Sequence, residues 1–292
     1  MEPKTPPRIF DARARRLRRD RAAARFEDAA FLHERAVEDV VDRILSVNRS
    51  FGSVAVTGDA GLLADDALLQ KGAERIVRGD ISARFAARRA IGRRAIFSED
   101  ALPFATEAFD LYVSMLTLHG VDDLPGALAQ IRRSLRPDGL FIGVLFGGET
   151  LGGIRRALIE AEAAASGGAS PRVFPFADVR ALGGLLQRAG FALPVADVDR
   201  VEIEYSSAVR LVADLRAIGE TNALAARDRR PAGRAQAGAL LSAMETALSR
   251  APALFEIVTL TGWAPHESQQ KPLAPGSAKS SLAAAVRGAR KE

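Results

Sequence analysis

The chain has 292 residues, no cysteine and a formal net charge of +5. Without cysteine it forms no disulfide, no thiolate metal site and no cysteine nucleophile. The charge is uneven, because residues 1–25 carry +6 and residues 269–292 carry +4, which leaves −5 for residues 26–268. An acidic globular part argues against nucleic acid as a partner, and no apolar run of about 18 residues predicts a membrane-spanning helix.

Both ends of the chain are basic, and we expect both to lie outside the main domain. Residues 1–25 predict a basic N-terminal extension, either a solvated amphipathic helix or a surface for an acidic partner or an anionic membrane. A mitochondrial transit peptide is disfavoured, because Glu2, Asp11 and Asp20 interrupt the stretch and serine is absent. Residues 269–292 are rich in Lys, Pro, Ser and Ala and predict a disordered basic tail.

The first part of the domain predicts a helix, a strand and a glycine-rich turn. Apolar residues recur at helical spacing through residues 26–47, so we expect a helix that packs on a sheet. An apolar run at residues 53–57 then enters Gly58-Asp59-Ala60-Gly61. A turn of this kind at a strand end lets backbone N–H groups approach a ligand closely. Gly58 and Gly61 are therefore candidate binding residues.

Residues 75–80 predict a second strand, which ends in an acidic residue, Asp80. In a parallel sheet, ligands sit at the carboxyl ends of the strands. Asp80 and Ile81 are therefore candidate ligand residues. The alternative is a structural role, in which Asp80 or Ser82 caps a helix at residues 83–90.

Two further strands are predicted at residues 94–97 and 109–115. The first leads into Glu99-Asp100-Ala101-Leu102, and the second contains Ser114 and is followed by His119. We expect these polar residues at the ligand-binding edge of the sheet. For His119, a purely structural hydrogen bond is the alternative to a role in catalysis.

The second half of the chain continues the alternation of helices and strands. A helix at residues 124–135 precedes Pro137-Asp138-Gly139, a strong turn signal because Pro presets φ and Gly accepts positive φ. An apolar strand at residues 140–146 follows, and strands at 201–205 and 255–263 fit the antiparallel end of a sheet. Further helices are expected at 151–165, 177–189, 207–218 and 235–250, with another that opens at Gly219-Glu220-Thr221-Asn222.

Three central motifs resemble the second half of class I S-adenosylmethionine-dependent methyltransferase domains. They are Asp-x-Leu-Pro-Phe at 100–104, Phe-Asp-x-x-Val-Ser at 109–114 and Leu-x-Pro-Asp-Gly-x-Phe at 135–141. The resemblance implies an α/β domain at residues 26–268, with a Rossmann-like seven-stranded sheet, helices on both faces and helical insertions. It also implies S-adenosylmethionine as the cofactor.

Three other segments resemble a narrower family, the methyltransferase-like assembly factor 5 of mitochondrial respiratory complex I and its bacterial relatives. They read F-G-G-E-T-L at 146–151, G-E-T-N at 219–222 and W-A-P-H-E-S at 263–268. This likeness runs from about residue 9 to residue 268. It implies a protein substrate, a subunit of the respiratory NADH dehydrogenase, in a bacterial cytoplasm. The basic ends would associate peripherally with the inner face of the membrane.

The resemblance places the cofactor against the glycine-rich turn and the strand ends. The residues that it implies as cofactor contacts are Gly58, Gly61, Asp80, Ile81, Asp100, Ala101, Leu102 and Ser114. The family form of the turn is an acidic residue followed by G-x-G-x-G, and this chain departs from it. Ala55 takes the acidic position, and Thr57 and Asp59 replace the first two glycines. Two interpretations of this turn are therefore possible: it belongs to a working cofactor site, or it has only the structural role of a tight turn.

Glu220, Asn222 and His119 are the candidates for catalysis. Methyl transfer needs mainly the alignment of donor and acceptor, with a base where the acceptor loses a proton. The resemblance also implies hydroxylation of a protein arginine, which commonly uses iron held by two histidines and a carboxylate. Only a convergence of His119 with His266 and Glu267 offers that set, so no metal site is predicted. The alternatives are a non-catalytic assembly module and a carboxyl methyltransferase that resembles the biotin-synthesis enzymes.

Overall fold

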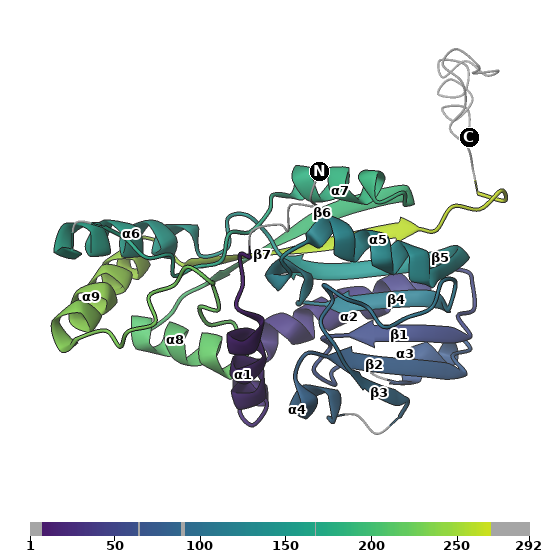
Figure 1. Ribbon diagram of the computed structural model, residues 1–292, viewed down its shortest axis with the longest axis horizontal. Coiled ribbons are helices and arrows are strands. Elements are labelled where there is room, and N and C mark those ends of the chain that lie inside the picture. Colours follow the sequence, from purple (N-terminus) through teal and green to yellow (C-terminus); the bar gives the residue numbers. More distant parts are fainter. Residues whose placement is uncertain (1–7, 64, 89–90, 167, 270–292) are drawn as a thin grey trace, which may run out of the picture.

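Seven strands form one mixed sheet in the computed structural model, which describes residues 8–63, 65–88, 91–166 and 168–269 (Figure 1). The strand order is β3-β2-β1-β4-β5-β7-β6. β1 to β5 pair in parallel, and β7 is antiparallel to β5 and β6. The predicted seven-stranded α/β sheet is therefore confirmed. The strands are β1 Ser53–Thr57, β2 Arg75–Asp80, β3 Arg93–Ile96, β4 Phe109–Met115, β5 Leu135–Phe146, β6 Ala192–Ile203 and β7 Ala253–Trp263.

Helices cover both faces of the sheet, as predicted. Because side chains alternate along a strand, Val54 and Val56 of β1 join the core under α2, α6, α8 and α9, whereas Ala55 joins the core under α5 and α7. The helices are α1 Ala12–Ala22, α2 Phe31–Ser46, α3 Asp65–Gln70, α4 Ala83–Ala86, α5 Leu124–Ser134, α6 Gly152–Ser166, α7 Val179–Arg188, α8 Ala208–Ala217 and α9 Arg234–Arg250.

The antiparallel end of the sheet is longer than the sequence predicts. β6 begins at Ala192, although Pro194 and two aspartates interrupt its apolar pattern. Proline is tolerated there because β6 is an edge strand with one unpaired side. The predicted turn at residues 137–139 lies inside β5, where Asp138 adopts a positive φ of 61°.

Two helix predictions are corrected by the structure. No helix opens at Asn222, and residues 219–233 are irregular, because Leu224 pairs with Phe10 and the Asn222 side chain bonds to backbone groups. The helix expected at 83–90 ends at Ala86. Within the described ranges no helix combines the length and apolarity needed to cross a membrane. The predicted tail lies almost wholly outside those ranges.

The N-terminal helix α1 is not the solvated helix that its composition suggests. The side chain of Asp11 caps it, and it packs against α4 and α8 (Figure 1). Arg15 and Arg19 are only 8% and 1% exposed, whereas Arg13 and Arg16 face solvent. Because positions i and i+4 share a helix face, α1 presents a buried cationic face to the carboxyl ends of the strands.

Candidate functional site

Three polar side chains meet at the carboxyl ends of β1 and β4. Glu99, which follows β3, accepts hydrogen bonds from the hydroxyl groups of Thr57 at 2.7 Å and Ser114 at 2.6 Å. Both hydroxyls are buried. Thr57 therefore uses its side chain to fix the turn from which the family's glycine is missing, and Ser114 already has a partner in the protein.

Asp80, one of the predicted cofactor contacts, is bound by an arginine of α1. The Arg19 guanidinium donates from Nε to Oδ1 at 3.1 Å and from Nη2 to Oδ2 at 2.6 Å. The side chains of this ion pair are 1% and 3% exposed. The Ser82 backbone N–H also donates to Asp80 Oδ1 at 2.7 Å. The carboxylate therefore has no free face for a ribose in this conformation.

Arg15 closes the same edge one turn earlier in α1. Its guanidinium donates from Nη1 to the Gly120 carbonyl at 2.7 Å and from Nη2 to the Thr117 carbonyl. Burial lowers the pKa of Arg15, against the opposing charge of Glu220. The loop after β4 is thereby tied to the N-terminal helix.

The space left between these residues is far too small for S-adenosylmethionine. The cavity bounded by Arg15, Thr57, Gly58, Asp80 and Ile81 has a volume of about 10 Å³, which is room for about one water molecule. Small-ligand sites usually measure about 300–1,000 Å³. A second cavity of about 10 Å³ adjoins Gly61. With α1 in place, the residues of this edge do not fit the cofactor.

Gly58 is held in the turn by both its backbone angle and its neighbours. Its φ is +71°, and a Cβ would lie 2.3 Å from Thr117 Cγ2 and 2.5 Å from the Met115 carbonyl oxygen. We expect Gly58→Ala to lower the free energy of unfolding by about 2 kcal/mol or more, because the Met115 backbone cannot withdraw. Urea unfolding measures this. Gly153→Ala is the control, since its Cβ meets nothing within 4 Å, and an equal effect at both sites would contradict the prediction.

Asp100, Ala101 and Leu102, which were also predicted as cofactor contacts, do not line the 10 Å³ cavity beside Asp80. Asp100 accepts from the Asp122 backbone N–H at 2.8 Å and from the Ser98 hydroxyl at 2.8 Å. Leu102 is half-buried against the core under α5 and α7, and Ala101 is exposed. The carboxylate of Asp100 thus shapes the loops after β3 and β4 in this conformation.

The structure brings His119 and Glu220 together, as their shared assignment to catalysis requires. His119 Nε2 lies 3.0 Å from Glu220 Oε2, and the side chains are 2% and 11% exposed. Burial opposes the charge of Glu220, but His119, Arg19 and Arg15 outweigh it and hold its pKa at about 2. Glu220 is therefore ionised at neutral pH, where it can accept a proton but has none to donate.

Asn222 and His266 contribute in other ways than the sequence suggests. Asn222 donates from Nδ2 to the Pro171 carbonyl at 2.8 Å and accepts from the Leu224 N–H at 3.1 Å, so its amide orders a loop. His266 and Glu267 follow the end of β7, which pairs with the first half of β5. They are exposed and lie at the opposite ends of the strands from His119. The convergence of His119 with His266 does not occur. Among the described residues no group of three or more His, Asp or Glu side chains is placed to hold a metal.

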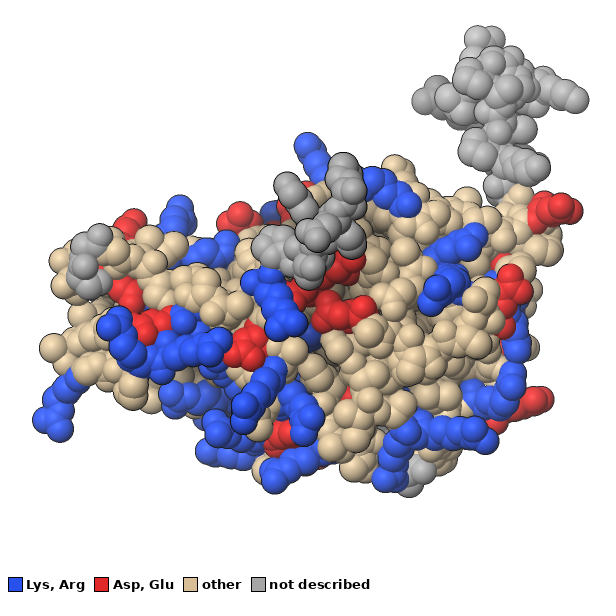
Figure 2. Space-filling model, in the orientation of Figure 1, with Lys and Arg blue, Asp and Glu red and all other residues tan. Residues whose placement is uncertain are grey.

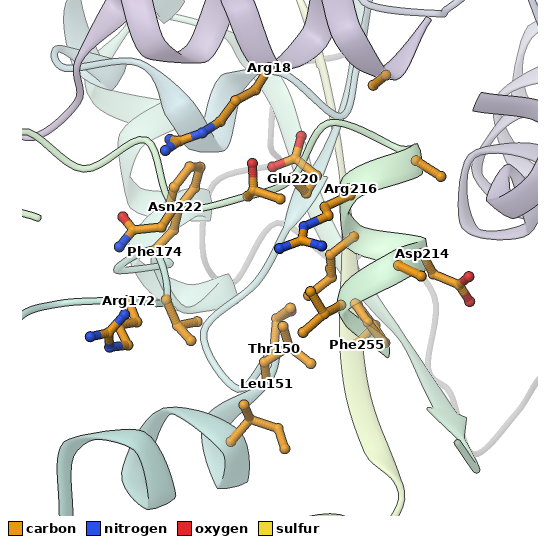
Figure 3. Close-up of a pocket in the computed structure, with 18 of the residues that line it drawn as sticks. Arg18, Thr150, Leu151, Arg172, Phe174, Asp214, Arg216, Glu220, Asn222 and Phe255 are labelled. Atoms are coloured by element: carbon orange, nitrogen blue, oxygen red, sulfur yellow. The ribbon is translucent and has the colours of Figure 1, made fainter. Parts of the chain in front are cut away.

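A large cavity of about 970 Å³ opens on the far side of α1 (Figure 3). It lies between α1, α6, α8 and α9 and the ends of β5 and β7, and Glu220 and Asn222 belong to its wall. The sequence did not predict the roles of Arg15 and Arg19, or of Arg18 and Arg216 at this cavity. The only local signal for Arg15 and Arg19 is that they share one helix face with Ala22. A helix face that carries arginines is normally predicted to be exposed to solvent, so this pattern does not predict their burial.

The chain is similar to known methyltransferase-fold proteins. A sequence profile of the methyltransferase domain matches residues 58–143. The YcgJ protein of Bacillus subtilis superposes with a TM-score of 0.53 at 11% identity, covering 80% of this chain and 99% of that one. A Bacillus halodurans protein gives a TM-score of 0.51 at 10% identity over 78% of this chain and 98% of its own. Fold and domain match together place the chain in the class I methyltransferase superfamily.

Curated relatives narrow this assignment. The mitochondrial arginine-hydroxylase NDUFAF5 of Danio rerio is 34% identical over 94% of this chain and 88% of its own length. The human protein of that name is 35% identical over 94% and 83%. The malonyl-[acyl-carrier protein] O-methyltransferase of Laribacter hongkongensis is 30% identical over 88% and 91%. The chain belongs to the NDUFAF5-like family of methyltransferase-fold proteins.

Proposed function

We propose that this chain acts on a protein subunit of a respiratory NADH dehydrogenase while that enzyme is assembled. The observation that carries the proposal is the extent of the likeness to the NDUFAF5 proteins, which covers 94% of the chain. The match to the methyltransferase domain covers only residues 58–143. The wider likeness thus includes α8 and α9 and the wall of the large cavity.

The chemistry carried by the relatives' name is hydroxylation of an arginine, and we extend it to this chain as the finer part of the proposal. The step would insert one oxygen atom of O2 into a C–H bond of the arginine, and the second oxygen atom would leave as water with two electrons and two protons from an external reductant. An assembly role without methyl transfer is the second candidate. It is favoured by the buried ion pair of Arg19 and Asp80, which engages the carboxylate that the resemblance implies as a cofactor contact. S-adenosylmethionine would act on this chain only after α1 had moved.

Deletion of the gene from the bacterium that carries it tests the proposal. The amount of assembled NADH dehydrogenase and the NADH oxidation rate of membranes are expected to fall, and the wild-type gene is expected to restore both. Glu220→Gln is expected to restore them poorly, because it removes the charge that holds His119. The exposed Glu267→Gln is the control.

Mass spectrometry of the NADH dehydrogenase subunits separates the two candidates. An arginine with one added oxygen that is present in the wild type and absent from the deletion strain supports hydroxylation. Lost assembly without any such difference supports the assembly role. Unchanged assembly and unchanged subunit masses would overturn the proposal.

The proposal includes a bacterial cytoplasmic location at the inner face of the membrane. Arg13, Arg16, Arg21 and Arg25 of the α1 region are exposed, and Figure 2 shows basic side chains gathered over α1 and α8. Basic residues near an anionic bilayer contribute about 1 kcal/mol each. Cell fractionation tests the location, and recovery of the protein in a periplasmic fraction would contradict it.

A further inference from the structure

The large cavity beside α1 carries more arginine than its own acids balance. Three of its arginines have carboxylate partners: Arg25 with Asp28 at 3.4 Å, Arg210 with Asp214 at 3.2 Å, and Arg172 with Glu162 at 2.7 Å. The side chains of the other three make no hydrogen bond or ion pair within the described part of the chain. They are Arg18, Arg21 and Arg216.

Arg18 provides the sharpest sign of a missing partner. Its Nη1 atom is buried and has no hydrogen-bond acceptor among the residues that the structure describes. Burial lowers the pKa of this guanidinium, and the charge of Arg227 acts in the same direction. A buried donor on a charged group is costly when it is left unpaired. Arg18 belongs to the wall of the cavity, so an anion in the cavity would supply its guanidinium with the partner that the described chain does not provide.

The side chains of the wall divide into a cationic interior and an outward-facing rim. Figure 3 shows Arg216 reaching from α8 into the middle of the cavity and Arg18 descending from α1 above Phe174 and Asn222, whereas Arg172 and Asp214 point away. Glu220 is also in the wall, but its Oε2 is already 3.0 Å from His119. An entering cation would therefore meet unpaired guanidinium groups, whereas the carboxylates of the wall, on Asp28, Asp214 and Glu220, each already pair with a basic side chain.

Most of the remaining wall is apolar. α6 contributes aliphatic side chains, and β5, β7 and the loop before α7 contribute aromatic rings. The buried members are Phe146, Leu151, Ile154, Leu158, Phe174, Met244 and Phe255. A surface of this kind favours an apolar body, because its contact with water is unfavourable. Cationic ligands and purely polar ligands are both poor matches for a cavity that combines unpaired arginines with apolar side chains.

We propose that this cavity binds a small amphipathic anion, with a carboxylate or phosphate group on Arg18 and Arg216 and an acyl-like body against the apolar wall. The planar guanidinium matches both anions in geometry. The volume of about 970 Å³ is at the upper end of the usual range for small ligands, about 300–1,000 Å³. This ligand is additional to the protein substrate proposed above, and its binding does not depend on that function.

Calorimetric titration of the full chain tests the proposal with four probes. Dodecanoate and dodecyl phosphate are the amphipathic anions, dodecyltrimethylammonium is the cation of equal chain length, and inorganic phosphate lacks the apolar body. One of the two amphipathic anions is expected to bind at one molecule per chain, at least about tenfold more tightly than the cation and than inorganic phosphate. The preferred head group distinguishes a fatty-acid type of ligand from a phosphate monoester.

Substitutions of the cavity arginines test whether the anion binds in this cavity. Arg18→Ala with Arg216→Ala is expected to weaken the preferred anion by at least about tenfold. Arg180→Ala, which removes an exposed arginine from α7, is the matched control and is expected to leave the affinity unchanged. The melting temperature verifies that each variant is folded. Equal binding of cation and anion, wild-type affinity in the double variant, or no binding of either amphipathic anion would each overturn the proposal, the last leaving an acidic protein segment as the occupant.

Discussion

S-adenosylmethionine is expected to bind this chain about a hundredfold more tightly after Arg19→Gln than before. Arg19 and Asp80 form a buried ion pair, and loss of one partner of such a pair costs about 3–5 kcal/mol. This cost falls on the state in which α1 covers the edge of the sheet. The apparent affinity of a ligand rises in proportion to the fraction of molecules that are open to it, and about 1.4 kcal/mol corresponds to a factor of ten.

Calorimetry of the two proteins measures this change. Arg16→Gln on the exposed side of the same helix is the control. Hydrogen exchange of α1 is expected to become faster when the cofactor binds, since the helix has to leave. Micromolar binding to the wild type without faster exchange in α1 would contradict occlusion. An affinity of Arg19→Gln equal to that of the wild type would also contradict occlusion. It would mean that the altered turn at Thr57 and Asp59 weakens the binding of S-adenosylmethionine.

His33 is expected to make the protein lose about 2 kcal/mol of stability between about pH 7.5 and about pH 5. The side chain is buried, and its ring packs edge-on against Phe26. Within the described ranges its ring nitrogens have no hydrogen-bond partner. Burial first, and then the charge of Arg19, lower its pKa from 6.5 to about 3. Below pH 6.5 the unfolded chain binds a proton that the folded chain refuses, so stability is full above that pH and falls towards pH 3.

Urea unfolding at the two pH values tests this prediction through His33→Leu. The variant is expected to lack this part of the pH dependence, whereas His266→Leu, at an exposed position, keeps it. Glu220 does not interfere, because its lowered pKa removes stability only as the pH falls from 4.5 towards about 2. An equal loss in the wild type and in His33→Leu would mean that other groups cause it.

The central strands could be predicted because their sequences are locally unambiguous. β4 and the second half of β5 are apolar runs that are buried on both faces, and short polar segments separate them. β6 was underestimated because an edge strand tolerates the proline and aspartates that argue against a strand elsewhere. The helix expected after Asn222 failed because a bridge to Phe10, far away in the sequence, determines that segment.

The candidate site was only partly accessible from the sequence for a related reason. His119 and Glu220 were chosen by resemblance, and the fold places them 3.0 Å apart. Arg19 could not be chosen, since its burial depends on Asp80, which lies 61 positions away. From a local sequence pattern, arginines are predicted to be exposed to solvent. Only the tertiary structure shows that one of them is buried because it pairs with a carboxylate at the end of a strand.

The long-range attachment of α1 also fixes when its edge of the sheet is closed during synthesis. Arg227 pairs with Asp11 across a separation of 216 positions, and Phe10 pairs with Leu224. A chain grows from its N-terminus at about 5–20 residues per second, so α1 leaves the ribosome first, yet these contacts wait until nearly the whole domain has emerged. For many seconds of each round of translation, α1 therefore lacks these contacts, which hold it over the edge of the sheet that carries Asp80 in the finished protein. A newly made chain would then be the form most open to a cofactor.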